Sequence, residues 1–519
     1  MRSRDLQQAL EKSGILRLQK QPILSLKGQG CIMAFIDTGI DIFDRQFRYS
    51  NGDTRIIRIW DMTDDSGTPP EGILYGSEYS EEDINKVLRG GGPDESETNE
   101  GVGDNVKVVE EGEDTGTNGE RKALVIDNIG RTGIAQDKLL HGNILAKIAA
   151  GNDGAVPEAY IVVVKLKPAK RYLRDYYFVK EDAVAFQEND IMLAVNYVRS
   201  VSIKLNMPIS LCMTLGTNGR GHDGSSALSY IIDRFVSGVG AVISMSVGDE
   251  GNKQLHAAGQ VVSEMASSLS SSIETVVADR GNIYDTIEVR VDERQQGLVI
   301  NIWGGKPGLI SVGVVSPTGE VIERVEPRIG KSEIYDLIFD GTTVTIEYDL
   351  VEGDTGDELI IIRLETPTAG IWSIRVYGDN QSYNVYLPIS QFIYENTYIL
   401  EPDPNITIVD PALANGALTT SLYNPVNGAL YINNGRGFVR DGAIKPDIAT
   451  ALSSGITAGA ACQFLNWGIV EGKDAELRAT DIKSYLIRGA IRDNAIPYPD
   501  RQWGYGKMDV YNSFEVIRG

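Results

Sequence analysis

Two residues of this sequence have the chemistry of a proton relay. Asp37 ends the apolar run 31–36 and precedes a Thr-Gly turn, which is a common position for a functional carboxylate at the end of a buried strand. His141 opens a segment, 141–150, with apolar residues at helical spacing. A carboxylate that orients an imidazole helps it to remove a proton from a nucleophile. Each residue also has an ordinary explanation, a turn for Asp37 and a helix cap or surface position for His141.

A third segment has the small and apolar residues of a buried helix. The run ATALSSGITAGAACQFL spans 449–465 and directly follows KPDI at 445–448. The segment that begins at His141 continues through a Gly-Pro turn into the apolar stretch 160–166. The pattern therefore predicts strands at 31–37 and 160–166, with helices after His141 and within 449–465, as the elements that position the chemistry.

These segments resemble three motifs of the subtilisin-like serine proteases. HGNILAKIAAGNDGAVPEAYIVVVKL is similar to the family pattern HGTxVAxxxAG...APxAxxxxVK, and 449–465 is similar to GTSxxAxxxAGA. The order Asp, His, nucleophile is also that of subtilisin. When the last motif is aligned on 456–460, its threonine falls on Thr450 and its serine on Ala451. The resemblance thus implies an aspartate and a histidine without a nucleophile, because a methyl group cannot attack a carbonyl.

Two further segments complete the implied site. PISLCMTLGTNGRGHDGSS resembles the strand and loop that hold the substrate backbone, which assigns substrate binding to Thr214, Leu215 and Gly216. VISMSVGDEGN resembles the segment with the oxyanion-hole asparagine and puts Asp249 in its place. An ionised carboxylate repels a developing oxyanion, so a donor worth on the order of a hundredfold in rate is missing. The alternative is that Asp249 turns away and caps a loop.

The short spacing between KPDI and the last motif leaves the alignment of that motif open. Subtilases usually have an APG-containing stretch between KPDI and the nucleophile helix, whereas ATALSSG follows KPDI almost at once here. A displaced nucleophile at Ser453 or Ser454 is therefore an alternative to an inactive site. On the unshifted alignment these serines lie two and three residues further into the helix. A rotation of about 100° per residue then points them elsewhere.

The expected fold class is α/β, a subtilisin-like core whose mainly parallel sheet is flanked by helices. Between 277 and 398, alternating β-rich stretches recur about every ten residues, separated by Gly, Pro, Asp and Asn turns. This spacing predicts an inserted all-β domain, an antiparallel sandwich of jelly-roll type. We therefore expect the first part of the core at 1–276, the β domain at 277–398 and the second part of the core at 399–519.

Several stretches narrow the resemblance to the clostridial Csp group of spore-germination proteases. TNGRGHDGSS, RGFVRDGAIKPDI and the region 330–378 carry this similarity. Some members of that group have degenerate active sites, and the group also carries an insertion of this kind. The resemblance implies a protein of the cortex or coat region of the spore, in which Asp37 and His141 are remnants of a catalytic triad.

The function that this implies is regulation without catalysis. The expected partner is a protein of the germination-protease or cortex-hydrolase pathway, or a small-molecule germinant. An active endopeptidase that uses a displaced serine and a structural spore protein are the two alternatives. Neither the motifs nor the chemistry requires a cofactor, and no metal-binding residues are assigned; many subtilases bind Ca²⁺, so a structural calcium ion is left open.

The composition limits the partners. The 519 residues carry a formal net charge of −23, which argues against nucleic-acid binding because that requires clustered lysine and arginine. No apolar stretch of about 18 residues predicts a membrane span. Residues 1–19 lack the apolar core of a secretory signal. Three cysteines in apolar segments are expected to be buried thiols and not a disulfide framework or a metal site; they are Cys31, Cys212 and Cys462.

Much of the negative charge lies in one stretch, 90–119, which is rich in glycine and acidic residues. Low hydrophobicity and dense like charge predict a solvated acidic loop there. It is either an inert insertion, a docking segment for a basic partner, or a cover over the cleft.

Overall fold

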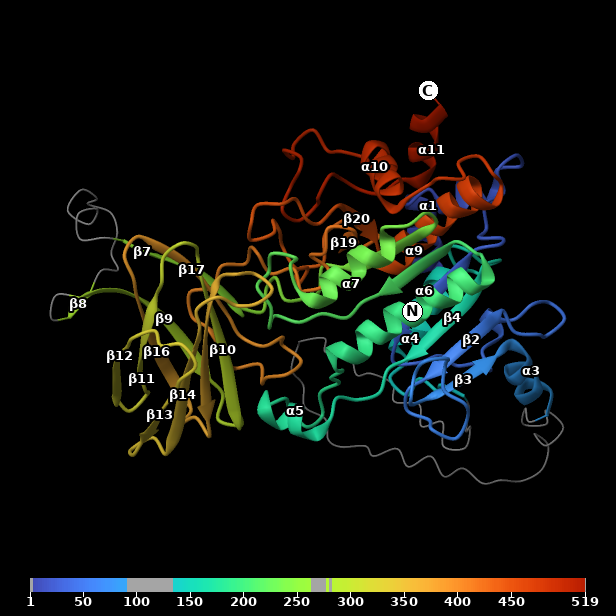
Figure 1. Cartoon of the computed structure of the whole chain (residues 1–519). Helices are drawn as coiled ribbons and strands as arrows, with labels where there is room; N and C mark the ends of the chain where they lie inside the picture. The colour runs from blue at the N-terminus through green and yellow to red at the C-terminus, as the bar shows by residue number, and fades with distance from the viewer. Residues whose placement is uncertain (1–2, 91–133, 263–276, 280–281, 519) are drawn as a thin grey trace, which may run out of the picture.

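A computed structural model of the chain describes residues 3–90, 134–262, 277–279 and 282–518 (Figure 1). The predicted acidic loop at 90–119 lies outside these residues except for Gly90. Figure 1 shows an α/β core beside a group of antiparallel strands. None of the described helices has the length and hydropathy that crossing a membrane requires.

The core is built on a mainly parallel sheet. Its described strands, eight in number, follow the order β20-β19-β6-β5-β1-β4-β2-β3, and β3 alone among them pairs antiparallel with its neighbour. All side chains of the central strands β1 and β5 are buried, which explains why their sequences are mainly apolar. The strands are β1 (Ile32–Asp37), β2 (Ile56–Asp61), β3 (Ser77–Ser80), β4 (Tyr160–Lys165), β5 (Ile209–Met213), β6 (Ala241–Ser246), β19 (Leu418–Tyr423) and β20 (Ile448–Ala451).

Helix α9 is buried along its whole length. It packs against β5 and α4, and its small residues permit this: a Cβ on Gly459 would lie only 2.3 Å from that of Ala155. The described helices are α1 (Ser3–Lys12), α2 (Ile15–Lys20), the 3-10 turn η1 (Arg45–Phe47), α3 (Glu81–Gly90), α4 (His141–Ala150), α5 (Arg171–Tyr176), α6 (Glu188–Leu205), α7 (Ala227–Val236), α9 (Ser454–Leu465), the π-helical turn η3 (Asn466–Val470), α10 (Ala479–Gly489) and α11 (Val510–Arg518).

The remaining strands form two antiparallel sheets that enclose a separate apolar core. One sheet has the order β13-β14-β15-β10-β17-β7, and the other has the order β12-β11-β16-β9-β18, with β8 also paired to β9. The strands are β7 (His256–Val261), β8 (Val277–Asp279), β9 (Asn282–Val291), β10 (Gly297–Gly304), β11 (Ser311–Val315), β12 (Val321–Val325), β13 (Ser332–Leu337), β14 (Thr342–Asp349), β15 (Glu358–Glu365), β16 (Gly370–Tyr377), β17 (Gln381–Tyr386) and β18 (Tyr398–Ile399).

The strand pairing locates the antiparallel part within the chain. Strand β7 lies before the predicted boundary at 277, and it pairs with β17 over its full length. Strand β18 lies at the predicted end of the domain and pairs with β9. The antiparallel part therefore begins at His256, because a strand that pairs only with this sheet belongs to it. The jelly-roll connectivity stays a prediction.

The core and the antiparallel part meet through aromatic and charged side chains. The ring of His222 from the core stacks on Tyr386 of β17 at 3.9 Å between centroids; within the antiparallel part, His256 of β7 stacks on the same tyrosine at 4.5 Å. Burial lowers the pKa of His222 to about 3, so its ring is neutral in this stack at physiological pH. Close by, the Arg440 guanidinium bonds the Asp357 carboxylate of the antiparallel part. These contacts tie the two parts together.

Candidate functional site

The predicted site residues gather at one edge of the core sheet. Asp37 is the last residue of β1, and Ala451 is the last residue of β20. Thr214 directly follows β5, and Asp249 lies three residues after β6. These strands all run parallel within the sheet, so their carboxyl ends meet at the same edge. That edge is where open α/β sheets place their functional groups.

Asp37 and His141 form the hydrogen bond that the sequence predicts. The Oδ1 atom of Asp37, which is fully buried, lies 2.8 Å from Nδ1 of His141. Oδ1 also accepts a hydrogen bond from the backbone N–H of Thr38 at 2.7 Å, and the Thr38 hydroxyl oxygen lies 3.1 Å away. The histidine side chain is 54% exposed, and its Nε2 has no partner among the described residues. The hydrogen bond to Asp37 raises the pKa of His141 above 6.5 because the carboxylate stabilises the imidazolium, while burial opposes the shift.

A second carboxylate, which the sequence did not single out, anchors this pair. Asp137 Oδ1 accepts from the Thr38 hydroxyl at 2.8 Å, and its Oδ2 accepts from the backbone N–H of Asn143 at 2.9 Å. The Thr38 hydroxyl oxygen in turn accepts from the N–H of Gly142 at 3.1 Å. A side chain at Gly142 would lie 2.4 Å from the Gly39 carbonyl, so glycine is needed for this close approach. The first turn of α4 is thereby fixed against the end of β1.

The predicted nucleophile position is a buried methyl group. Ala451 has no exposed surface, and the next residue, Leu452, has a left-handed φ of 70°. This turn separates the strand from α9, which begins at Ser454 and not at Ala451. Ser453 is the N-cap, and its hydroxyl oxygen accepts from the N–H of Gly455 at 3.1 Å. The two serines are therefore at the start of the helix, and the expected displacement into it by two and three residues is wrong.

The second serine is buried between α9 and the sheet. Ser454 is 1% exposed, and its hydroxyl lies 3.9 Å from the Cys212 sulfur on β5. Burial raises the pKa of Cys212 to about 12, and the charge of Asp37 adds to this shift. Neither Ser454 nor Ser453 hydrogen-bonds to His141 within the described part of the chain. All three cysteines are buried and free, as predicted.

The predicted substrate-binding segment is partly covered by another segment of the chain. Residues 214–216 are partly exposed. A Cβ on Gly216 would lie 2.1 Å from Cγ2 of Val409, and a Cβ on Gly248 would lie 2.8 Å from the same atom. The Val409 side chain, which is 5% exposed, thus fills the space between the segments that follow β5 and β6. Nothing in the local sequence pattern marks Val409, because its position depends on packing between distant segments.

The residue after Val409 holds it in place. Asp410 and Thr217 exchange two backbone hydrogen bonds, at 2.9 and 3.0 Å. The Asp410 carboxylate accepts from the hydroxyls of Ser226 at 2.6 Å and Ser229 at 3.0 Å. Burial raises the pKa of Asp410 to about 6, and the two serine hydroxyls oppose the shift. Val409 is therefore part of a fixed framework and not of a surface loop.

Asp249 is a solvent-exposed carboxylate. It has neither a hydrogen bond nor an ion pair with any described residue, so it does not cap a loop there. The next residue, Glu250, is buried and accepts from the backbone N–H of Ser390 at 3.1 Å and from its hydroxyl at 3.2 Å. Burial raises the pKa of Glu250 to about 7, and the nearby charge of Asp249 contributes to the rise.

Comparison with solved structures identifies the architecture. The CspB protease of Clostridium perfringens matches with a TM-score of 0.75 and 21% identity, over 98% of this chain and 97% of that chain. The chain has a subtilisin-like fold. Two further structures, the psychrophilic protease S41 and the subtilisin-like protease Apa1 of an Antarctic Pseudoalteromonas, match with TM-scores of only 0.38 and 0.32 at 13% and 12% identity. They cover 96% and 98% of this chain and 97% and 96% of their own chains, and they add nothing to the assignment.

No family profile and no curated protein matches the sequence. The predicted fold class, an α/β subtilisin-like core with an antiparallel β part, is confirmed by the strand topology and by the CspB likeness. Within the described ranges, no three histidine, cysteine, aspartate or glutamate side chains gather as a metal site would require. At this edge of the fold, the arrangement can hold and polarise an imidazole, but Ala451 gives it no hydroxyl to activate.

Proposed function

We propose that this protein is a pseudoprotease, a subtilisin-like fold that has lost its peptidase chemistry and acts by binding. The observation that carries the proposal is Ala451 at the end of β20, at the same sheet edge as an intact hydrogen bond between Asp37 and His141. The side chains that remain can orient a histidine, but acyl transfer requires a nucleophilic oxygen as well.

Three further features support this proposal over a displaced nucleophile. Ser454 is buried, and the hydroxyl of Ser453 accepts a hydrogen bond as the helix cap. Asp249 carries negative charge at the predicted oxyanion position, where catalysis needs a donor. Val409 fills the space beside the segment assigned to substrate binding. Each feature weakens a different step of peptide hydrolysis.

The proposed role is regulation of spore germination, in the cortex or coat region of the spore. It rests on the sequence resemblance to the Csp group and is consistent with the CspB-like fold. The partner in this proposal is a protein of the germination-protease or cortex-hydrolase pathway, or a small-molecule germinant. No cofactor is needed for such a role.

A complementation experiment tests the proposal. Spores that lack the protein should germinate poorly, and both the wild-type gene and a His141→Ala variant should restore germination, because a binding protein does not need the proton relay. An enzyme that uses a displaced serine would lose function with His141→Ala. Ser453→Ala is the matched control that removes the partly exposed candidate hydroxyl. Normal germination without the protein would instead favour a structural role, and peptide turnover abolished by Ser453→Ala or Ser454→Ala would overturn the pseudoprotease assignment.

A further inference from the structure

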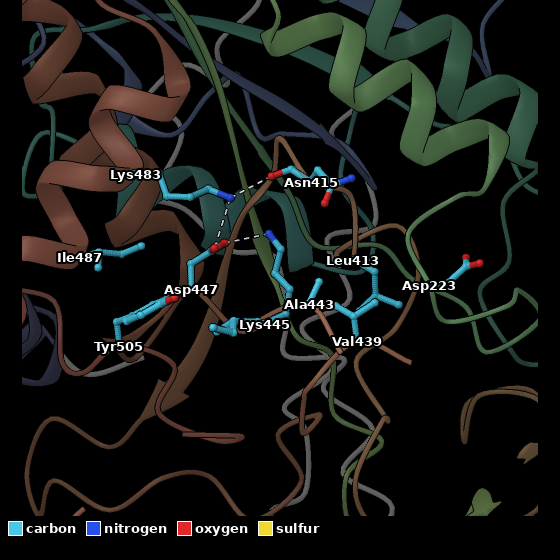
Figure 2. Close-up of a pocket in the computed structure, with 11 residues that line it drawn as sticks. Asp223, Leu413, Asn415, Val439, Ala443, Lys445, Asp447, Lys483, Ile487 and Tyr505 are labelled. Atoms are coloured by element: carbon cyan, nitrogen blue, oxygen red, sulfur yellow. Dashed lines mark hydrogen bonds and ion pairs between the residues drawn. The ribbon is translucent and has the colours of Figure 1, made fainter. Parts of the chain in front are cut away.

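One cavity lies away from the sheet edge that holds Asp37, His141 and Ala451. It has a volume of about 330 Å³. Asp447, in its wall, precedes β20, whereas Ala451 ends that strand, so the strand's length of roughly 13 Å separates the two positions. Figure 2 shows the lining side chains, which come from α10, from the segment before β19 and from the segment 439–447, with Asp223 before α7 and Tyr505 before α11.

The polar part of the cavity contains a lysine whose hydrogen bonds are complete. Nζ of Lys445 donates to the carbonyl of Ala417 at 2.6 Å, to the hydroxyl of Thr419 at 2.9 Å and to Oδ2 of Asp447 at 2.8 Å. An ammonium has three protons, so none remains for a ligand. Burial lowers the pKa of Lys445 to about 7, and the charge of Asp447 opposes that shift. Lys445 therefore holds Asp447 in place.

A second lysine has a proton to spare. Nζ of Lys483 lies 3.2 Å from Oδ1 of Asp447 and donates to the Asn415 carbonyl at 2.9 Å. These two contacts use two of its three protons. Its side chain is 19% exposed, which leaves the ammonium accessible from the cavity. In Figure 2 the Asp447 carboxylate lies between the amino groups of Lys445 and Lys483. The Asp447 carboxylate is thus held by both lysines, and Lys483 is the one with a proton left for an added negative charge.

The rest of the lining limits the size and type of ligand. The other acidic group, Asp223, already accepts from the backbone and hydroxyl of Ser225 at 3.0 and 2.6 Å, and Arg440 lies 3.7 Å away. Most of the remaining wall is apolar; it is formed by Leu413, Val439, Ala443, Ile444 and Ile487, with the ring of Tyr505. A ligand with one anionic end and a short apolar body would match both parts.

We propose that this cavity binds a small monocarboxylate, with its carboxylate on the free proton of Lys483 and its apolar body against α10 and the segment 439–447. A single charge-assisted hydrogen bond in a half-open site fits a carboxylate, since a phosphate would need more donors than one lysine supplies. The site does not involve Asp37, His141 or Ala451, so the proposal is independent of whether the protein is a protease.

Calorimetric titration of the purified full chain tests this proposal, with acetate, butyrate, hexanoate and benzoate as probes. Hexanamide and benzamide are the matched neutral probes, and sodium chloride at equal ionic strength controls for salt. We expect saturable binding of the longer carboxylates and of benzoate, with no binding of the amides. Lys483→Met should weaken binding about tenfold to a hundredfold, because a hydrogen bond to a charged group is lost. Lys483→Arg should retain most of the affinity.

Two other variants keep the test independent of folding. Lys204→Met removes an exposed lysine that pairs with Glu71 far from this cavity, and it should leave binding unchanged. Ala443→Trp narrows the cavity at an exposed position, so it should abolish binding of benzoate without changing the melting temperature. The proposal is overturned if none of the carboxylates binds, if the amides bind equally well, or if Lys483→Met and Ala443→Trp both bind like the wild type.

Discussion

Replacing Ala451 with serine will not by itself produce an active peptidase. The new hydroxyl would stand at the end of β20, at the same sheet edge as the bond between Asp37 and His141. Two other obstacles would remain. Asp249 presents a carboxylate at the predicted oxyanion position, and Val409 still fills the space beside the predicted substrate strand. We therefore expect activity to return only when all three features are changed.

The expected magnitudes follow from the kind of interaction lost. Removal of the triad serine from subtilisin lowers turnover about a millionfold. A missing oxyanion donor accounts for about 10²–10³-fold, or about 2.7–4 kcal/mol. A substrate side chain that cannot be buried forfeits about 1.5–3 kcal/mol. The last two defects together amount to about 4–7 kcal/mol, so Ala451→Ser alone should stay about 10³–10⁵-fold below the fully repaired site.

A series of three variants measures these steps. Turnover of a fluorogenic peptide and labelling by a fluorophosphonate probe are compared for Ala451→Ser, for its combination with Asp249→Asn, and for the triple variant with Val409→Gly. The variant with Asp249→Asn and Val409→Gly but without the serine is the matched control and should be inactive. His141→Ala should abolish the activity of the triple variant. Turnover by Ala451→Ser alone within about tenfold of the triple variant would refute the reasoning.

Three other substitutions test the electrostatics. Asp37→Asn should lower the pKa of His141 in an NMR titration and reduce the free energy of unfolding by about 1–3 kcal/mol. Because the folded pKa of His141 is raised, the stability that its charged form contributes is fully present below pH 6.5 and is lost as the pH rises through the folded pKa. An unchanged histidine pKa would contradict this. The wild type should gain stability between about pH 7 and 10, because Lys445, with a folded pKa of about 7, binds fewer protons in the folded than in the unfolded state in that window. Lys445→Met should lose this gain. Urea titrations of both proteins at pH 7 and 9 measure it, and an equal change in the free energy of unfolding of the two proteins would contradict the prediction. Arg440→Met should cost about 3 kcal/mol in the same assay, at the low end for a broken buried pair because Lys306 still lies 3.2 Å from Asp357; a neutral effect would show that this pair does not tie the two parts together.

The sequence predicted those features of the fold that depend on local pattern. The unbroken apolar run before Asp37 and the helical spacing after His141 gave β1 and α4, with the predicted residues at the end of one and the start of the other. The β-rich alternation after 277 gave the antiparallel strands. These signals are local, since each depends on which face of a single element is buried.

Features that depend on non-local packing were not predictable from the sequence. Strand β7 pairs with β17, more than a hundred residues away, and nothing within β7 indicates this pairing. Val409 reaches Gly216 and Gly248 only because the chain folds back across the sheet edge. The start of α9 was misplaced for a different reason. Leu452 adopts a left-handed φ that bulky residues rarely take, so the alignment with the family motif, which put Ala451 at the start of the helix, began the helix too early.

The features that the site retains and those that it lacks differ in what they contribute to the fold. Asp37 is fully buried and accepts hydrogen bonds from the backbone N–H of Thr38 and from His141, so its replacement would remove hydrogen bonds to a charged group at a total cost of about 1–3 kcal/mol. Ala451 is also fully buried, but a serine there would bury a hydroxyl that needs a partner, whereas a methyl group needs none. The fold can therefore lose its nucleophile at little cost in stability and still require the aspartate. It follows that the hydrogen bond between Asp37 and His141 does not by itself indicate catalysis, and that the proposed loss of peptidase activity rests on Ala451, Asp249 and Val409.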